Sequence, residues 1–548
     1  MSRSTGAGPG RAAQLGWLPW LLLAAAWFAT VQVRPLLDPD EGRYAEIPRE
    51  MLVSGDWVTP RFDDLKYFEK PPLQYWATAA VYGAAGVHPW SSRLWGVGLA
   101  LACLPLVYAF TRRLYGARAA LAALAALAVS PYFLILGHLN LLDQAFTFFL
   151  CAAVFAFILA QCGPLEEGRR FMLLAWACAA LAVLSKGIVV GVLCGGALIL
   201  YSLIERDWRA WRGLHSLPGL ALFALIAAPW FVLVSVRNPS FPGFFFVHEH
   251  FARFLTTVHQ RVEPWWFFLP LLLLMVLPWI AEVWRAARAG GAAAAEPGVA
   301  VSFKPLRFLL VFCGVTFVFF SASGSKLAPY ILPLAPPLAV LAGVYAAGAV
   351  QLVRRASWVT LAFAAVLSVG LALYSAHRNA YVPLALVHWC IAALLLALAA
   401  ALAVRWLPAA DPRKPVLAGL LGAVLSWQCL LCAFTLMPPE RSAAGLVAQV
   451  RPFITPGIPL YSVGQYRETI SPYLGRTLIL AGYEGELAFG LGEEPQRRLS
   501  TEAFAERWSS GGAAVAFFEP DVWDQWRRRG LPGRVIAADY HTVAVSRL

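Results

Sequence analysis

Long apolar segments separated by short polar loops run through roughly the first 435 residues of the chain. Their lengths are close to the ~20 residues that an α-helix needs to cross the hydrocarbon core of a bilayer. They are continuous rather than alternating, unlike the ~10-residue strands of a transmembrane β-barrel. The pattern predicts a polytopic α-helical membrane protein. We count about thirteen spans, centred near residues 25, 100, 128, 151, 177, 196, 226, 275, 314, 340, 366, 394 and 427.

The loops between these spans alternate in character, and this alternation predicts their orientation. One set is basic and mostly short, for example around Arg112, Arg169, Arg206 and Arg354. Short loops rich in Lys and Arg stay in the cytoplasm, so this side and the N-terminus are predicted to be cytoplasmic. The other set mixes acids, bases, histidines and aromatic residues. It includes residues 35–90, residues 237–264 and the chain after Pro438. We therefore expect the functional groups on the outer face.

Residues 35–90 contain two further predicted helices. In RYAEIPREMLVSGDW, the apolar residues Tyr44, Ile47 and Met51 recur at helical spacing, with charged residues between them. This pattern predicts an amphipathic helix that lies at the membrane interface. A Pro-Pro pair then precedes LQYWATAAVYGAAG, which predicts a second short helix. We expect both to be juxtamembrane helices on the outer face.

The character of the chain changes near residue 439, which predicts two domains. Residues 1–438 would form the transmembrane catalytic domain, including the loops 35–90 and 237–264, and residues 439–548 a small α/β domain. The expected elements are helices at 439–457 and 502–510 and strands at 459–464, 477–483, 513–520 and 541–548. The glutamates of its segment 482–494 indicate a solvated acidic loop.

Composition excludes several functional classes. The net charge of +13 comes largely from the basic loops that topology requires, and no compact basic motif with interleaved aromatic residues appears, so nucleic-acid binding is excluded. The nine cysteines lie in or beside apolar segments, which gives no disulfide framework. The sequence has no glycine-rich nucleotide fingerprint, so we expect no nucleotide cofactor.

Ionisable residues recur where predicted spans meet the outer interface. Each alone is explained by snorkelling or anchoring, but several loops present acids and bases at one membrane level, which predicts a polar site. These residues are Asp40 and Glu41 after the first span, Lys66, Glu69 and Lys70 in KYFEKPPLQYW, Asp143 in LLDQAFT, Lys186, then His248, Glu249, His250 and Arg253 in HEHFARF, and finally Lys326 and Tyr330 in SGSKLAPYILP.

The basic members of this set have the chemistry of a phosphate site. Lys70, Arg253 and Lys326 together would bind a phosphate at the headgroup level. An Arg guanidinium donates two parallel hydrogen bonds to a phosphate, and a Lys ammonium supplies a compact positive charge. Tyr330 would add a hydrogen bond. Asp40 beside them would face a nucleophile or the developing positive charge of a sugar.

Glu69 and His250 are the candidate metal ligands. A carboxylate with an imidazole suits a divalent ion such as zinc or manganese. Two ligands do not define a metal site by their spacing, however, and a hydrogen-bonded Glu–His pair fits the sequence equally well.

The order of these motifs resembles a known family. DPDEGRYAE after the first span, then YFEKPPLQYW, then LLDQAFT resembles the membrane glycosyltransferases of the GT-C fold. DEGRYAEIPREML, EKPPL, HEHFARF and SGSKLAPYILP are similar to the aminoarabinose transferase branch, close to the protein O-mannosyltransferases. The similarity extends from about residue 15 into the C-terminal domain. It implies a GT-C fold.

The resemblance also implies substrates and a location. The donor would be 4-amino-4-deoxy-L-arabinose on undecaprenyl phosphate, and the acceptor a lipid A phosphate, at the periplasmic face of the bacterial inner membrane. Transfer would proceed by direct displacement with inversion. Masking a lipid A phosphate would confer resistance to polymyxin and other cationic peptides. The expected partners are these two lipids and the surrounding membrane lipids, with no nucleic acid, and we expect a monomer.

The resemblance assigns roles to residues as well. Asp40 would be the essential acid with Glu41 as its local partner, and Asp143 the second acid. Lys70, Arg253, Lys326 and Tyr330 would hold the donor phosphate. Glu69 and His250 would be the metal position.

Three alternatives remain open at the level of sequence. Another GT-C enzyme would move mannose or another hexose from a polyprenyl phosphate to a protein or glycan. A transporter would place ionisable residues near the middle of the membrane and would show paired repeats with broken helices. A structural membrane protein would use the same charges only as interfacial anchors.

Overall fold

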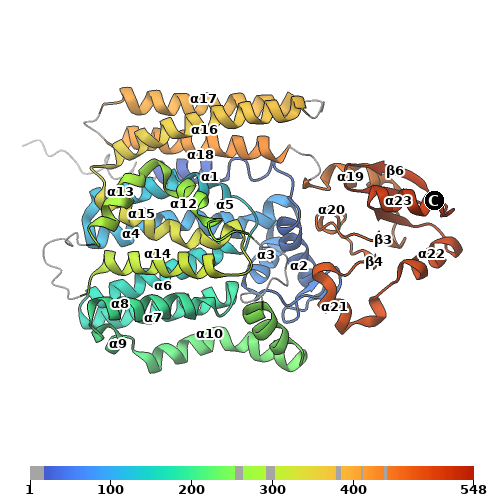
Figure 1. Cartoon of the computed structure of the whole chain (residues 1–548), viewed down its shortest axis with the longest axis horizontal. Helices are drawn as coiled ribbons and strands as arrows, with labels where there is room; N and C mark the ends of the chain where they lie inside the picture. The colour runs from blue at the N-terminus through green and yellow to red at the C-terminus, as the bar shows by residue number, and fades with distance from the viewer. Residues whose placement is uncertain are drawn as a thin grey trace, which may run out of the picture.

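The computed structural model describes residues 18–252, 263–291, 303–377, 384–408, 412–436 and 441–547. Figure 1 shows a bundle of long helices, a small α/β domain at one end of it, and the helices α2 and α3 between them. We refer to this end of the bundle as the polar end. The structure agrees with the predicted fold class of a helical membrane protein with a C-terminal α/β domain.

Apolar helices form the bundle. Ten described helical segments are long and apolar enough to cross a membrane, and α1 and α8 are shorter apolar helices. All thirteen predicted centres fall within bundle helices, but those near 100 and 128 share one 40-residue helix, α4, which is interrupted at Gly116 with φ 78°. The bundle helices are α1 (Leu18–Phe28), α4 (Pro89–Ala128), α5 (Pro131–Gly137), α6 (Asp143–Cys162), α7 (Leu165–Lys186), α8 (Val189–Glu205), α9 (Arg209–Arg212), α10 (Ser216–Arg237), α12 (Phe268–Val276), α13 (Ile280–Arg288), α14 (Pro305–Ala322), α15 (Ala335–Tyr345), α16 (Ala349–His377), α17 (Leu384–Trp406) and α18 (Arg413–Thr435).

The two predicted juxtamembrane helices form, as α2 (Asp40–Ser54) and α3 (Leu73–Ala85), with a hairpin of β1 (Arg61–Phe62) and β2 (Leu65–Lys66) between them. Helix α2 is more enclosed than an amphipathic surface helix, because every residue from Glu41 to Met51 is buried. Its polar face is covered by the C-terminal domain, which periodicity within α2 could not reveal.

The C-terminal domain is built on a five-stranded sheet of order β4-β3-β5-β7-β6. Strands β4, β3 and β5 are parallel, and β7 joins β5 and β6 antiparallel. Its elements are α19 (Ala444–Val450), β3 (Leu460–Val463), α20 (Ile470–Leu474), β4 (Ile479–Ala481), α21 (Ala488–Glu493), α22 (Thr501–Ser510), β5 (Val515–Phe518), α23 (Pro520–Arg528), β6 (Arg534–Ala538) and β7 (Val543–Ser546).

All four predicted strands of this domain are present, whereas β6 was not predicted. Strand β6 is a mostly exposed edge strand without the alternation that marks a half-buried strand. The predicted helix 439–457 is shorter, as α19. The domain boundary predicted at residue 438 stays a prediction, because residues 437–440 lie outside the described residues.

One hydrophobic core joins the C-terminal domain to the polar end. Tyr44 and Ile47 of α2 and Phe62 of β1 belong to the same buried cluster as Leu460 and Phe517 of the sheet. The opposite face of the sheet packs against α22 and α23 in a second cluster. The domain is therefore docked on α2 through shared apolar burial, not merely tethered.

Gly42 of α2 marks the closest approach within this contact. A Cβ at this position would lie 2.6 Å from the carbonyl carbon of Glu468 and 2.7 Å from the backbone nitrogen of Thr469. Backbone atoms cannot move aside as flexible side chains do, so only glycine allows this packing.

We predict that Gly42→Ala destabilises the docked C-terminal domain by about 1–3 kcal/mol, because the added methyl group forces the two backbones apart. The measurement is the thermal unfolding midpoint of the purified protein in detergent. Gly83→Ala is the matched control, since a Cβ there would meet only the Leu52 side chain at 3.8 Å. Equal midpoints for Gly42→Ala and the unchanged protein would show that the contact is looser than described.

Candidate functional site

A small polar pocket lies where α2, the segment before α3, the start of α6, the end of α7 and the segment 327–330 meet. It brings together five predicted site residues from four separate stretches of sequence: Asp40, Glu69, Lys70, Asp143 and Tyr330. Its lining is Asp40, Arg43, Tyr44, Glu69, Lys70, Leu141, Leu142, Asp143, Lys186, Leu327, Pro329 and Tyr330.

Two of the three acids of the pocket each begin a helix, and the side chain of the third, Glu69, is only 9% exposed. Asp40 is the first residue of α2 and Asp143 the first residue of α6, where the positive end of the helix dipole favours a carboxylate. The Asp40 side chain is 32% exposed and lies 3.1 Å from an Nη of Arg43. The Asp143 side chain is only 8% exposed and forms an ion pair with Lys186. Asp40 is therefore the acid that an incoming molecule can reach.

Lys186 is a residue of the pocket to which the sequence assigned no role. It is the last residue of α7, and its ammonium lies 4.3 Å from the ring centre of Tyr330, a cation–π contact. Its position at the end of a predicted span was the only signal in the sequence. Lys186 neutralises Asp143 and fixes the orientation of the Tyr330 ring beside it.

Lys70 carries the accessible positive charge near Asp40. Its ammonium donates to the Glu69 carbonyl oxygen at 2.9 Å and lies 3.9 Å from the Glu69 carboxylate and 3.7 Å from the Glu249 carboxylate. Both carboxylate distances are too long for strong hydrogen bonds. Lys70 is therefore a cation of the pocket wall that lies between two carboxylates.

The other two predicted phosphate ligands are placed differently. Lys326 is buried beside the pocket and donates to the carbonyl oxygens of Ser323 at 2.8 Å and Glu263 at 3.1 Å. An ammonium has three donors, so these two bonds leave capacity for an anion. Arg253 lies outside the described residues.

The geometry of His250 suits metal binding. Its Nδ1 lies 2.6 Å from the carbonyl oxygen of Phe245, which favours the tautomer with the proton on Nδ1 and a lone pair on Nε2. Glu69 lies in the pocket wall. Among the described residues, no third His, Cys, Asp or Glu joins Glu69 and His250 in a cluster of possible metal ligands. The Glu69–His250 metal position stays a prediction.

Glu41 does not take the catalytic place predicted for it. Its carboxylate accepts two hydrogen bonds from Arg93 at 2.7 and 2.8 Å and others from the backbone N–H groups of Asn140 and Leu37. Burial alone would raise the Glu41 pKa, but Arg93 beside it holds that pKa below its usual value. Glu41 is thus a buried anion that fixes the start of α2 and positions Asp40.

Arg43 connects the pocket to the C-terminal domain. Its guanidinium contacts Asp40 in the pocket and forms a two-pronged ion pair with Glu486 of the C-terminal domain. It also lies 5.9 Å from the ring centres of Tyr44 and Tyr67. Glu486 therefore sets the position of the cation that holds Asp40.

The interpretation of segment 482–494 as a solvated acidic loop is wrong. Glu493 lies 3.3 Å from the Lys66 ammonium and accepts a hydrogen bond from Ser240, and Glu494 lies 3.1 Å from Arg61. Lys66 and Arg61 belong to the β1–β2 hairpin and Ser240 lies just after α10, so all three are far from this segment in sequence. Glu486, Glu493 and Glu494 thus join the C-terminal domain to the polar end, while Glu484 is exposed and pairs with Arg498 of its own domain.

Two family models match the chain. Residues 21–245 match the model for dolichyl-phosphate-mannose-protein mannosyltransferases. Residues 446–547 match the model for the aminoarabinose transferase C-terminal domain. The first match includes the pocket residues from α2, the segment before α3, α6 and α7, and the second covers the domain that docks beside them.

Several relatives are similar in sequence. The undecaprenyl phosphate-alpha-4-amino-4-deoxy-L-arabinose arabinosyl transferase 1 of Proteus mirabilis is 34% identical over 60% of this chain and 58% of its own length. The corresponding transferase of Pseudomonas paraeruginosa is 35% identical over 67% of this chain and 66% of its own length. In sequence, the chain thus matches less than two thirds of these relatives.

The similarity in structure extends over nearly the whole chain. The crystal structure of ArnT from Cupriavidus metallidurans bound to undecaprenyl phosphate superposes with a TM-score of 0.86 at 33% identity, covering 97% of this chain and 98% of that one. The apo structure of the same protein gives a TM-score of 0.84 and covers 98% of both chains.

We predict that Glu41→Gln lowers the free energy of unfolding by about 3–5 kcal/mol, because it leaves the Arg93 guanidinium buried without its counter-charge. Thermal unfolding in detergent measures this. Glu167→Gln breaks the exposed pair with Arg113, whose side chains are 38% and 45% exposed, and should cost at most about 1 kcal/mol. Similar losses in the two variants would contradict the positioning role of Glu41.

Glu468 predicts a pH dependence for the docked state. Burial, together with the negative charges of Glu486 and Asp38, raises the Glu468 pKa to about 8. A raised carboxyl pKa means that the folded state binds the proton more tightly, so this group lowers stability as pH rises from about 5 to about 8. The unfolding midpoint of the unchanged protein should fall more steeply over this range than that of Glu468→Gln. Parallel curves would contradict this assignment.

Proposed function

This chain belongs to the aminoarabinose transferase family, and on that premise we propose that it transfers 4-amino-4-deoxy-L-arabinose from undecaprenyl phosphate to a phosphate of lipid A. The observation that carries the proposal is the pocket itself, which an accessible carboxylate, Asp40, lines together with Lys70 and the paired Asp143 and Lys186. A lipid that carries a sugar on a phosphate needs carboxylates to contact the sugar and cations to bind the phosphate.

The chain is a multi-pass inner-membrane protein. We assign the pocket and the C-terminal domain to the periplasmic face and the N-terminus to the cytoplasm. The basic loops support this orientation, since Arg206, Arg209 and Arg212 lie around the short helix α9, between α8 and α10. A pocket at the headgroup level would meet both lipid substrates without removing either from the membrane.

The phosphate of the donor would bind to Lys70, Lys326, Arg253 and Tyr330. Negative charge grows on this phosphate as its bond to the sugar breaks, and cations already in place stabilise it without reorganisation. Glu69 and His250 would hold a zinc or manganese ion, which when bound would add positive charge at the same phosphate.

The transfer would be a direct displacement at the anomeric carbon. An oxygen of the acceptor phosphate forms the new bond, the bond to undecaprenyl phosphate breaks with its electron pair, and the configuration inverts. The second pKa of a phosphate monoester is about 6, so the acceptor is already ionised and no base is needed. Asp40 would then orient the amino sugar or stabilise positive charge on its ring.

A consequence for the cell follows from the charges. The product would carry an amino sugar on a phosphate that was previously exposed and anionic. Cationic peptides such as polymyxin are attracted to anionic membrane surfaces, so this modification would weaken their binding. We expect the transferase to act as a monomer.

The second candidate is the transfer of mannose or another hexose to a protein or glycan, which the match of residues 21–245 to the mannosyltransferase model supports. A hydroxyl acceptor must lose a proton, so Asp40 would have to act as a general base. The two candidates differ in the acceptor and in the role of this one carboxylate.

We predict that Asp40→Asn lowers transfer at least about 100-fold, since the variant loses the charge that faces the sugar. The assay adds purified protein to a radiolabelled undecaprenyl-phosphate aminoarabinose donor with lipid A or acceptor peptide, and mass spectrometry detects one added aminopentose on lipid A. Asp56→Asn is the matched control, because Asp56 pairs with Arg237 outside the pocket.

The assay separates the candidates. Transfer to lipid A that is lost in Asp40→Asn and kept in Asp56→Asn supports the proposal. Transfer only to peptide would contradict the proposal and favour the second candidate. Full activity of Asp40→Asn on lipid A would remove the assigned role of this carboxylate.

A further inference from the structure

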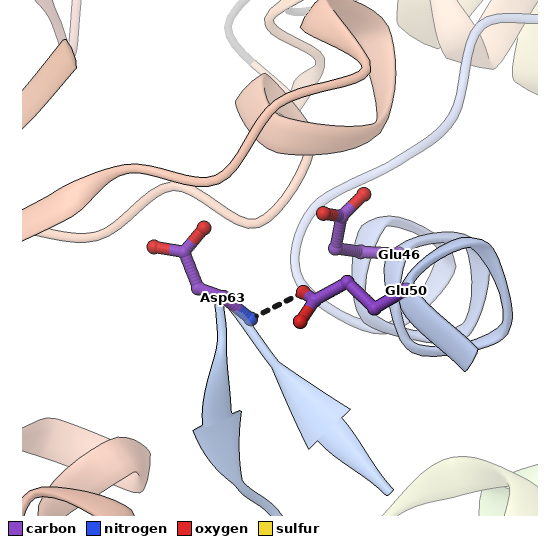
Figure 2. A group of neighbouring side chains, drawn as sticks. All are labelled: Glu46, Glu50 and Asp63. Atoms are coloured by element: carbon purple, nitrogen blue, oxygen red, sulfur yellow. Dashed lines mark hydrogen bonds between the residues drawn. The ribbon is translucent and has the colours of Figure 1, made fainter. Parts of the chain in front are cut away.

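A second group of acids lies buried about one helical turn beyond the pocket. Glu46 and Glu50 project from the same side of α2, and Asp63 comes from the turn of the β1–β2 hairpin; Figure 2 shows the three side chains facing a common space. One oxygen from each can be chosen so that all lie within 4.8 Å of one another. The three residues are 0%, 7% and 3% exposed.

The charge of this group is not balanced by its neighbours. Arg49 donates to Glu46 and supplies one positive charge against three carboxylates. The nearby cations Arg61 and Arg497 form ion pairs with Glu494 and Asp64, respectively. Two negative charges therefore remain in a water-excluded space, which costs several kcal/mol unless a counter-charge or protons compensate.

One buried oxygen atom of the group has no hydrogen-bond partner among the described residues. It is the Oδ2 atom of Asp63, whose Oδ1 accepts hydrogen bonds from Leu478 N–H at 2.8 Å and Ser471 Oγ at 3.0 Å. The hydroxyl of Tyr466, a residue that is 8% exposed, lies beside Ser471 and within electrostatic range of Asp63 and Glu46. A buried carboxylate oxygen without a donor, next to two other carboxylates, fits a bound cation.

The carboxylates are held as the ligands of a metal usually are. The Glu50 oxygens accept hydrogen bonds from the backbone N–H groups of Asp63 at 2.6 Å and Asp64 at 2.8 Å. Arg49 holds Glu46, and Ser471 with Leu478 holds Asp63. Such bonds fix the orientation of a ligating carboxylate and leave lone pairs for the ion.

We propose that Glu46, Glu50 and Asp63 bind a divalent cation, Ca²⁺, where α2, the hairpin and the C-terminal domain meet. All the donors are oxygens, which favours Ca²⁺ and Mg²⁺ over zinc or copper. Ca²⁺ ligands lie at about 2.3–2.6 Å and tolerate irregular geometry, which suits oxygens separated by up to 4.8 Å. Its double charge balances the two uncompensated carboxylates.

This cation would stabilise the contact that positions α2. Asp63 binds Ser471 of α20 and the backbone just before β4, while Glu46 and Glu50 belong to the helix that begins with Asp40. A shared ion would join these elements across the interface of the C-terminal domain. This site differs from the Glu69–His250 pair in position and in its all-oxygen donor set, and it does not depend on the proposed transfer reaction.

The experiment uses the full-length protein in detergent after treatment with EDTA and removal of the chelator. Tb³⁺, which replaces Ca²⁺ and emits when nearby tyrosines or tryptophans are excited, is titrated in and then displaced with CaCl₂. His250→Ala serves as the background so that the other predicted metal position is silent. We expect one saturable Tb³⁺ site, displaced by Ca²⁺ in the range of about 10⁻⁶–10⁻³ M.

Matched variants locate the ion. Asp63→Asn and Glu50→Gln should weaken Ca²⁺ binding at least about tenfold, whereas Asp64→Asn, on the same hairpin with a side chain 46% exposed, should bind as the background does. In the unchanged protein, CaCl₂ should raise the thermal unfolding midpoint and EDTA should lower it, a comparison that requires no variant to fold.

Other outcomes would overturn the proposal. These are the lack of saturable Tb³⁺ or Ca²⁺ binding, or equal binding in Asp63→Asn and Asp64→Asn. The proposal would also be wrong if CaCl₂ left the unfolding midpoint unchanged while lower pH raised it, and if the Asp63→Asn variant no longer showed this increase at low pH. That result would mean that protons, not a cation, neutralise the group.

Discussion

Helix α2 carries five charged side chains into an interface where water is excluded, and each must find a partner there. Glu41 meets Arg93 of α4, Arg43 meets Glu486 of the C-terminal domain, and Glu46 meets Arg49 on the same helix. Removing one member of such a pair leaves a buried charge whose desolvation costs several kcal/mol. The bundle, the helix and the C-terminal domain are thereby fixed in one arrangement, and the first residue of that helix is Asp40.

This constraint explains why the acids of the polar end have different roles. Asp38 accepts hydrogen bonds from Arg467 and Thr469 and thus attaches the C-terminal domain, while Glu41 ties α2 to α4. Asp143 is neutralised by Lys186. Asp40, about a third exposed, is the most accessible acid of the pocket, and Arg43 pairs with both Asp40 and Glu486. The C-terminal domain therefore supports the pocket wall through Glu486. This contact is a physical reason for the domain to be part of the same protein as the helix bundle.

Much of this could be predicted from the sequence, where local patterns carry the information. All thirteen centres predicted from hydropathy fall within bundle helices, although two share α4, and the resemblance pointed to five residues that the structure places in one pocket. The partners of buried charges could not be predicted, because Arg43 and Glu486 lie 443 positions apart and Glu41 and Arg93 lie 52 apart. The same lack of long-range information hid the contacts that bury the polar face of α2 and made segment 482–494 look solvated. Glu41 was predicted to be catalytic because it is next to Asp40 in sequence. That position could not reveal its buried ion pair with Arg93.

The central claim is that α2, held between the bundle and the C-terminal domain, presents Asp40 to the sugar of a lipid donor whose phosphate binds at Lys70. The most direct measurement is a cryo-EM structure of this chain with a non-hydrolysable undecaprenyl-phosphate aminoarabinose analogue. The account predicts phosphate density within hydrogen-bonding distance of the Lys70 ammonium and the sugar ring against the Asp40 carboxylate, with the Arg43–Glu486 pair intact. A phosphate bound away from Lys70, or a sugar that does not contact Asp40, would contradict it.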